Sequence, residues 1–151
     1  EQIGLQLRQL LQSGFVTAVG GYVRRVDEGC QLLLSHAGHP HFMHYVAATS
    51  QTCLVEMEAR HALGLSLDRD QAHESFLLER GDKLLFYTDG AIETVSEMAR
   101  EFGRDALRQC FSDNAARPLD EMLPVIRERL AEHQGEAPRT DDVTLLAMEI
   151  L

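Results

Sequence analysis

Basic residues, cysteines and long apolar runs are all scarce in this sequence. Lysine and arginine number 14 against 24 aspartates and glutamates, which gives a formal net charge of −10 at pH 7. Because so acidic a surface repels nucleic-acid backbones and anionic lipids, we expect neither a nucleic acid nor a membrane among the partners. No apolar stretch approaches the roughly 18 residues that a membrane-spanning helix needs, and no export signal opens the chain.

The three cysteines are too scattered for a disulfide framework or a zinc knuckle. Cys30, Cys53 and Cys110 include no pair with C-x-x-C spacing, and we interpret each as a buried thiol. Reduced thiols without an export signal predict a cytoplasmic protein. The sequence also has no Walker loop, no G-x-S-x-G and no G-x-G-x-x-G, so it gives no sign of the sites that those motifs build.

The first half of the chain has the pattern of strands joined by short turns. A length of 151 residues suits one domain with its own core. After an amphipathic helix over 2–12, the apolar spacing predicts an antiparallel meander of strands over 15–26, 31–37 and 42–46. A hairpin of strands over 75–78 and 83–87 is expected around the turn at 79–82. The segment 47–71 has no clear pattern beyond a short extended piece at 63–67.

After Gly90 the apolar residues recur at helical spacing. Helices are expected over 91–98, 103–111 and 118–132, the last with a kink or a later start because of Pro124. A loop and a closing strand over 143–151 end the chain. Strands grouped first, helices grouped later and a final returning strand predict an α+β fold.

Two acidic motifs flank apolar, strand-like runs. Asp89 and Gly90 follow Leu84 to Thr88, and Asp141 and Asp142 precede a run that starts at Val143. A carboxylate buried at the end of a strand is costly unless it meets a cation. We therefore expect Asp89 and Asp141 to lie close together at the ends of neighbouring strands, where both can bind one hard divalent ion.

Each motif also has an ordinary explanation. Asp89 can cap a helix that begins near Ala91, and the Asp141–Asp142 pair can be an exposed loop. His36, His39, His41 and His44 fall within nine residues, but a turn and a strand would scatter them, so we favour partly exposed turn histidines over a metal site. Arg24 and Arg25 diverge if they lie on a strand, which favours solvated surface charges over a phosphate site.

Several segments together resemble the metal-dependent protein phosphatase (PPM) family, in its SpoIIE-type bacterial branch. The resemblance covers most of the chain, and its segments occur in the family's order: Phe15-Val16-Thr17-Ala18, His36-Ala37-Gly38-His39-Pro40, Leu63-Gly64-Leu65, Arg80 to Gly90 with Glu93, Phe102-Gly103 with Leu107, and Asp141-Asp142-Val143-Thr144. It implies a layered PPM-type β-sandwich of mainly antiparallel strands flanked by helices, with its N-terminal part missing. Residues 1–151 would be the later three-quarters of that domain.

The resemblance also implies roles for single residues. Asp89 and Asp141 would be metal ligands and catalytic residues, and Gly90 would keep the backbone close to the metal. Asp142 and Thr144 would support this site, Thr144 through its hydroxyl. The cofactor would be two Mn²⁺ or Mg²⁺ ions. The family also needs an earlier Asp and an Asp-Gly pair, which this sequence lacks, so we expect this chain alone to bind metal weakly and to be nearly inactive.

Two functions follow from the resemblance. The first is a protein serine/threonine phosphatase of bacterial signalling, whose substrate is a phosphoprotein such as an anti-sigma-factor antagonist and whose control comes from a receiver or sensor domain in the same chain. The second is a non-catalytic, phosphatase-like adaptor that binds a sigma factor or its regulators. We favour the enzyme for the parent protein, because retaining both Asp89 and Asp141 has no obvious use in a scaffold.

Overall fold

The computed structural model describes residues 14–27, 29–58, 60–65 and 73–151. The helix predicted over 2–12 lies outside these residues. The chain divides into two compact units: the first is Glu1–His39 with Met57–Leu78, and the second is Pro40–Glu56 with Glu79–Leu151. Each unit contains one antiparallel sheet. Among the helices described, none is both long and apolar enough to cross a membrane.

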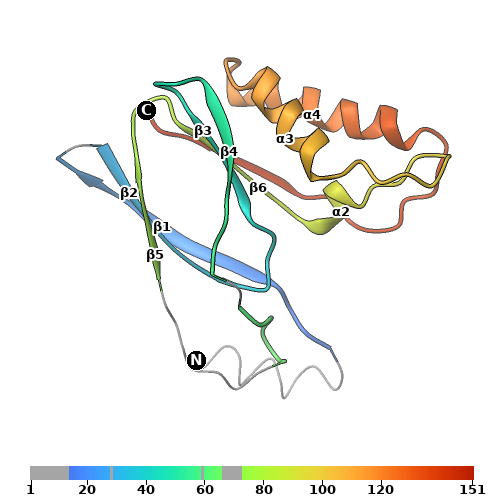
Figure 1. The fold of residues 1–151 in the computed structure, drawn as a ribbon, viewed down its shortest axis with the longest axis horizontal. Helices are drawn as coiled ribbons and strands as arrows, with labels where there is room; N and C mark the ends of the chain where they lie inside the picture. The colour runs from blue at the N-terminus through green and yellow to red at the C-terminus, as the bar shows by residue number, and fades with distance from the viewer. Residues whose placement is uncertain (1–13, 28, 59, 66–72) are drawn as a thin grey trace. The chain divides into compact units, whose positions relative to one another are not determined.

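The first unit contains a three-stranded sheet in the order β1-β2-β5 (Figure 1). The strands are β1 (Ala18–Val26), β2 (Gly29–Ala37) and β5 (Glu74–Leu78). The predicted pairing of the first two strands is confirmed, and Gly29 supplies the positive φ of +128° at the turn between them. From Leu32 onward, every second side chain of β2 is buried, namely Leu32, Leu34 and His36, because alternate residues of a strand share a face.

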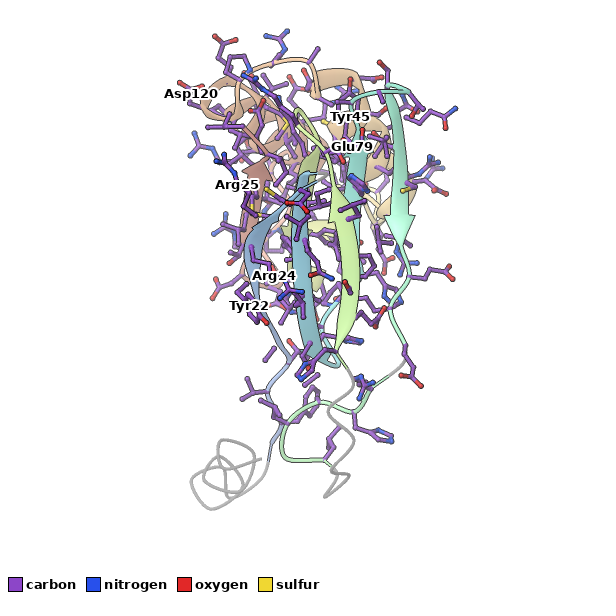
Figure 2. All side chains as sticks on the ribbon, turned by 90° about the vertical axis from the view of Figure 1, so that its left-hand side faces the viewer. Tyr22, Arg24, Arg25, Tyr45, Glu79 and Asp120 are labelled. Atoms are coloured by element: carbon purple, nitrogen blue, oxygen red, sulfur yellow. The ribbon has the colours of Figure 1, made fainter. Side chains whose placement is uncertain are left out.

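Arg24, which Figure 2 labels, begins a hydrogen-bonded polar row on the opposite face of this sheet. Arg24 Nε donates to Gln31 Oε1 at 2.6 Å, and Gln31 Nε2 donates to Ser75 Oγ at 2.6 Å. Arg24 pairs with Gln31 in register, and Arg25 pairs with Cys30, so the two arginines project from opposite faces of β1. The interpretation of Arg24 and Arg25 as diverging surface charges is thereby supported.

The second unit contains a four-stranded sheet and the described helices. Its strand order is β4-β3-β6-β7. The strands are β3 (Phe42–Val46), β4 (Gln51–Val55), β6 (Lys83–Tyr87) and β7 (Leu145–Glu149), and the helices are α2 (Asp89–Ile92), α3 (Arg104–Asn114) and α4 (Leu119–Gln134). The α+β class predicted from the sequence is confirmed.

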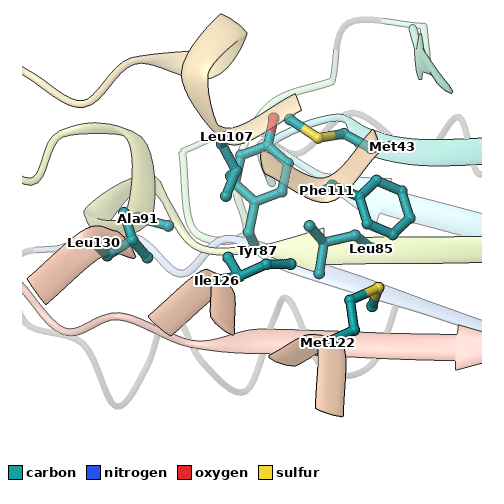
Figure 3. Close-up of a cluster of buried hydrophobic side chains, with 9 residues drawn as sticks. All are labelled: Met43, Leu85, Tyr87, Ala91, Leu107, Phe111, Met122, Ile126 and Leu130. Atoms are coloured by element: carbon teal, nitrogen blue, oxygen red, sulfur yellow. The ribbon is translucent and has the colours of Figure 1, made fainter. Parts of the chain in front are cut away.

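The core of the second unit lies where α3 and α4 pack on the sheet (Figure 3). Each of these helices buries one apolar stripe, which is the pattern that predicted them. The cluster has nine buried members: Met43, Leu85, Tyr87, Ala91, Leu107, Phe111, Met122, Ile126 and Leu130. Pro124 does not delay α4, which begins at Leu119 and continues past it.

The prediction of a β-hairpin around residues 79–82 is wrong. The turn exists, with Asp82 N–H donating to Glu79 O at 3.1 Å, but β5 and β6 belong to different sheets. The turn's polar groups are satisfied within the second unit instead. Gly81 N–H donates to Ile150 O at 2.8 Å, and the buried Asp82 carboxylate accepts from Ala47 N–H at 2.9 Å and pairs with His44 Nε2 at 2.9 Å.

Three smaller expectations also fail, and one strand was not foreseen. The strand over 42–46 is not part of a meander with β2, because it pairs with β4 and β6. The strand β4 was not predicted at all. The helix expected over 91–98 is limited to α2, since a bridge between Val95 and Glu101 turns the chain back. Finally, none of the three cysteines is fully buried: Cys53 is exposed, and Cys30 and Cys110 are half-buried.

Candidate metal and phosphoryl-transfer site

The two acidic motifs lie at adjoining ends of neighbouring strands. Strands β6 and β7 pair antiparallel, and their last aligned pair is Tyr87 with Leu145. Asp89 begins α2 two residues beyond that pair, and Asp141 lies four residues before Leu145 (Figure 1). The expectation that neighbouring strands carry these motifs is met, while the role of Asp89 and Asp141 as metal ligands remains a prediction.

A hydroxyl that the sequence analysis did not single out joins the two motifs. Thr88 Oγ1 donates to Asp142 O at 3.0 Å and accepts from Thr144 N–H at 3.0 Å. Thr88 N–H also donates to Thr144 O at 3.1 Å. The hydroxyl that bridges the two segments is that of Thr88, and Thr144 takes part through its backbone N–H and carbonyl. The supporting role of the Thr144 hydroxyl, which the resemblance implies, stays a prediction. The only signal for Thr88 in the sequence was its place directly before Asp89.

Gly90 fits against the other motif so closely that a side chain has no room. A Cβ atom added to Gly90 would lie 2.5 Å from the Asp142 carbonyl oxygen and 3.4 Å from Asp141 Cβ. The Gly90 carbonyl accepts the hydroxyl of buried Thr94 at 2.7 Å, which ties the short helix α2 to the chain that follows it. The absence of a side chain at Gly90 is thus what lets the two acidic segments approach.

The carboxylates themselves are exposed. Asp89, Asp141 and Asp142 all lie at the surface, and Asp141 and Asp142 precede the start of β7. Because water can solvate these carboxylates, their charge does not by itself require a cation beside them. Asp89 Oδ1 accepts from its neighbour Gly90 N–H at 3.1 Å, and Asp141 Oδ1 accepts from Asp142 N–H at 2.7 Å. The position before α2 belongs to Thr88, so Asp89 is not the capping residue either.

The oxygen atoms at this site are of the kind that a hard cation binds, but they are fewer than such a cation takes. Carboxylate and carbonyl oxygens are the ligands that Mg²⁺ and Mn²⁺ prefer. Asp89 and Asp141 supply carboxylates, and the Gly90 carbonyl keeps one lone pair besides the one that Thr94 uses. Within the described ranges, however, no group of three or more His, Cys, Asp or Glu side chains is placed to share an ion.

The histidines form no alternative metal site in the described part of the chain. The expectation of partly exposed turn histidines is wrong for two of them. His36 is buried in β2, with Nε2 2.7 Å from Glu58 O, and His44 lies in β3, with Nε2 2.9 Å from the Asp82 carboxylate.

Two groups near the core of the second unit have shifted acidities. Burial raises the pKa of the Tyr87 phenol, and the guanidinium of Arg104 opposes part of the rise. Burial likewise raises the pKa of the Cys110 thiol. Cys110 lines a cleft of about 510 Å³ between α3 and α4, together with Arg129 and His133. No residue of 88–90 or 141–144 lines this cleft, so it is separate from the acidic site.

Comparison with known proteins identifies the family and the fold of this chain. A family model described as Stage II sporulation protein E (SpoIIE) matches residues 2–151. Protein IcfG of Synechocystis sp. (strain ATCC 27184 / PCC 6803 / Kazusa) is 28% identical over 87 residues, which cover 58% of this chain and 14% of that protein.

Two solved structures match nearly the whole chain. The SiaA-PP2C domain of Pseudomonas aeruginosa has a TM-score of 0.79 at 25% identity, over 97% of this chain and 56% of that one. The RsbU and RsbW domains of a Mycobacterium tuberculosis protein have a TM-score of 0.78 at 28% identity, over 98% of this chain and 40% of that one. The chain therefore spans about half the length of these structures, and its antiparallel sheets and helices match the fold of PPM phosphatases.

Proposed function

Since this chain belongs to the SpoIIE family and is a phosphatase domain of the PP2C type, we propose that it hydrolyses phosphoserine or phosphothreonine on a partner protein with the help of Mn²⁺ or Mg²⁺. The observation that carries the proposal is the pairing of β6 with β7, which brings Asp89 and Asp141 to adjoining strand ends. The contact between Gly90 and Asp142 closes the remaining space between the two segments.

The proposed metal ligands are the carboxylates of Asp89 and Asp141, with the Gly90 carbonyl beside them. When bound, a pair of ions would supply an activated water and the positive charge that favours in-line attack on phosphorus. Thr88 holds the two segments in register through its hydroxyl, and Gly90 keeps them close. Because the carboxylates are exposed, a phosphorylated segment of a folded partner can reach them.

The extent of the domain is also part of the proposal. Hard divalent ions take about six oxygen ligands, some of them waters. Since the described residues group only two carboxylates and one carbonyl here, we place the further protein ligands of a two-ion site outside them. The resemblance places such ligands before the segment that corresponds to Phe15. This agrees with residues 1–151 being the later three-quarters of a SpoIIE-type phosphatase domain.

The substrate and the control of the enzyme are proposed from the resemblance. A phosphoprotein such as an anti-sigma-factor antagonist would be the substrate, and a receiver or sensor domain in the same polypeptide would regulate it. One of the similar structures carries RsbU and RsbW domains together, which supports a signalling role for this fold type.

A direct test compares the 151-residue chain with its full-length parent on a phosphoserine peptide in millimolar Mn²⁺. We expect feeble turnover by the chain and ready turnover by the parent, abolished there by Asp89→Asn. The matched control is Asp120→Asn, which removes an exposed carboxylate from α4. Turnover by the parent that survives Asp89→Asn would disprove the ligand assignment.

The adaptor alternative draws support from the small number of ligands grouped in the described residues. An adaptor predicts that the full-length parent neither turns over phosphopeptide nor takes up Mn²⁺, yet still binds a sigma factor or one of its regulators. Mn²⁺ uptake by the parent decides between the two functions without depending on the choice of substrate.

A further inference from the structure

The chain between α2 and α3, residues 93–103, folds into a closed turn. Val95 and Glu101 form an antiparallel bridge across it. At its base, Gly103 N–H donates to the carbonyl of Ile92, the last residue of α2, at 2.8 Å. We call residues 93–103 the α2–α3 turn. Since it is bonded to α2 at its base, it is positioned by the same short helix that begins with Asp89.

The α2–α3 turn is attached to the end of α4 by three contacts. Glu97 Oε1 accepts from Glu136 N–H at 3.0 Å. His133 Nε2 lies 2.9 Å from Arg100 O, and because a carbonyl can only accept, this nitrogen must carry the proton. The ring of Phe102 packs edge-on against the His133 ring, with centroids 5.2 Å apart.

The Glu97 contact falls where the chain leaves α4 for Asp141. Gly135 ends the helix with φ of +56°, and a Cβ added there would lie 2.7 Å from Glu97 Oε1. Residues 135–142, which we call the Asp141 loop, start at this contact. Their other end is held by Gly90 and Thr88 through the Asp142 carbonyl. Both ends of the Asp141 loop are therefore fixed by residues of one continuous segment, 88–103.

We propose that Glu97 is a positioning residue that orders the Asp141 loop relative to Asp89. The inference rests on the proposed function, because Asp141 is placed for a metal. A carboxylate that accepts from a backbone amide makes a stronger bond than a neutral acceptor does. Glu97 thus fixes the first residues of a loop whose following residues, 138–141, are exposed. Ala137 is also held by Gln134, whose carbonyl accepts the Ala137 N–H at 3.1 Å and whose Nε2 donates to the Ala137 carbonyl at 2.8 Å. Glu97 supplies the bond that ties this start of the loop to the segment that carries Asp89.

The test uses Glu97→Leu, which removes the acceptor, and Glu97→Gln, which keeps an acceptor oxygen without the charge. Glu101→Leu is the matched control, since it makes the same change at another exposed carboxylate of the α2–α3 turn. Amide hydrogen exchange over 136–142 reports loop order, and a Mn²⁺ titration followed by electron paramagnetic resonance reports the affinity of the full chain for the metal alone.

For Glu97→Leu we expect faster exchange over 136–142 and a Mn²⁺ dissociation constant raised about tenfold, the usual effect of losing a group that orients a ligand. Glu97→Gln should bring both the exchange rate and the Mn²⁺ dissociation constant most of the way back to the wild-type values. Glu101→Leu should match the wild type in both measurements. Unchanged exchange in Glu97→Leu, or faster exchange with unchanged Mn²⁺ affinity, would overturn the inference alone. A full-length parent that took up no Mn²⁺ would defeat the proposed function, and the exchange data would still decide whether Glu97 orders the loop.

Discussion

Thr88 and Thr144 are linked twice, once through their backbones and once through the Thr88 hydroxyl. Thr88 N–H donates to Thr144 O at 3.1 Å, and Thr144 N–H donates to Thr88 Oγ1 at 3.0 Å. The pairing of β6 with β7 is thereby extended beyond its last aligned pair, toward Asp89 on one strand and Asp141 on the other. The separation of the two acidic segments is thus set by hydrogen bonds as well as by strand pairing.

Replacing Thr88 with valine should reduce the free energy of unfolding by about 1–2 kcal/mol, because the Thr144 amide and the Asp142 carbonyl lose their partner. Thr88→Ser keeps the hydroxyl and should stay close to the wild type. Urea unfolding of the three proteins measures the difference. Since valine keeps the threonine methyl group and loses only the hydroxyl, a Thr88→Val protein as stable as the wild type would show that the two hydroxyl bonds do not stabilise the fold.

Gly90→Ala should lower the free energy of unfolding by about 1–3 kcal/mol, since the added methyl group meets backbone that must move. The nearest atom, the Asp142 carbonyl oxygen, would be 2.5 Å away. Gly20→Ala is the matched control, because nothing lies within 4 Å of a Cβ at Gly20 in β1. For Gly20→Ala we expect the free energy of unfolding to stay the same or to rise by up to about 1 kcal/mol, because alanine reduces the conformational entropy of the unfolded chain. Equal effects at both positions would show that the space around Gly90 is not limiting.

Much of the second unit could be predicted from local pattern. The strand β6 is almost entirely buried, and the continuous apolar run Leu84 to Tyr87 identified it. The apolar stripes of α3 and α4 likewise identified the faces of these helices that are buried in the core. The pairing of β6 with β7 followed from a chemical argument about two acidic motifs rather than from either strand alone.

Partners in other parts of the chain explain what could not be predicted. A turn at 79–82 has the same local chemistry whether its flanking strands pair or separate, and here the distant residues His44 and Ala47 bind Asp82. The strand β4 is five residues long, with its first residue, Gln51, and its middle residue, Cys53, exposed, which left its pattern weak. The exposure of Asp89 and Asp141 also could not be read from the strands beside them.

That exposure has a consequence for stability. In metal-free buffer at pH 7, Asp141→Asn should leave the free energy of unfolding within about 0.5 kcal/mol of the wild type. The asparagine oxygen can still accept the Asp142 amide, which now lies 2.7 Å from Asp141 Oδ1. Urea melts with and without millimolar Mn²⁺ test this. We expect Mn²⁺ to stabilise the wild type more than the variant, because a ligand stabilises only the state that binds it.

A loss of several kcal/mol in metal-free Asp141→Asn would contradict the metal assignment. It would mean that the Asp141 carboxylate stabilises the loop itself, independent of any ion. If Mn²⁺ stabilised the wild type and Asp141→Asn equally, that result would also contradict the assignment of Asp141 as a metal ligand.

Tyr87 lies in the core of the second unit and is only 2% exposed. Because burial raises the pKa of its phenol above the ordinary value of 10.0, the folded state holds the phenolic proton more tightly than the unfolded state does. Stability from this group is therefore complete below pH 10 and is lost as the pH rises through the folded-state value. Between pH 9 and pH 11.5, the stability measured by thermal or urea unfolding should fall less steeply with rising pH for Tyr87→Phe than for the wild type. Tyr22→Phe, which removes a phenol that is 59% exposed, should keep the wild-type slope. Parallel curves for Tyr87→Phe and the wild type would show that the Tyr87 phenol does not set the alkaline limit of the fold.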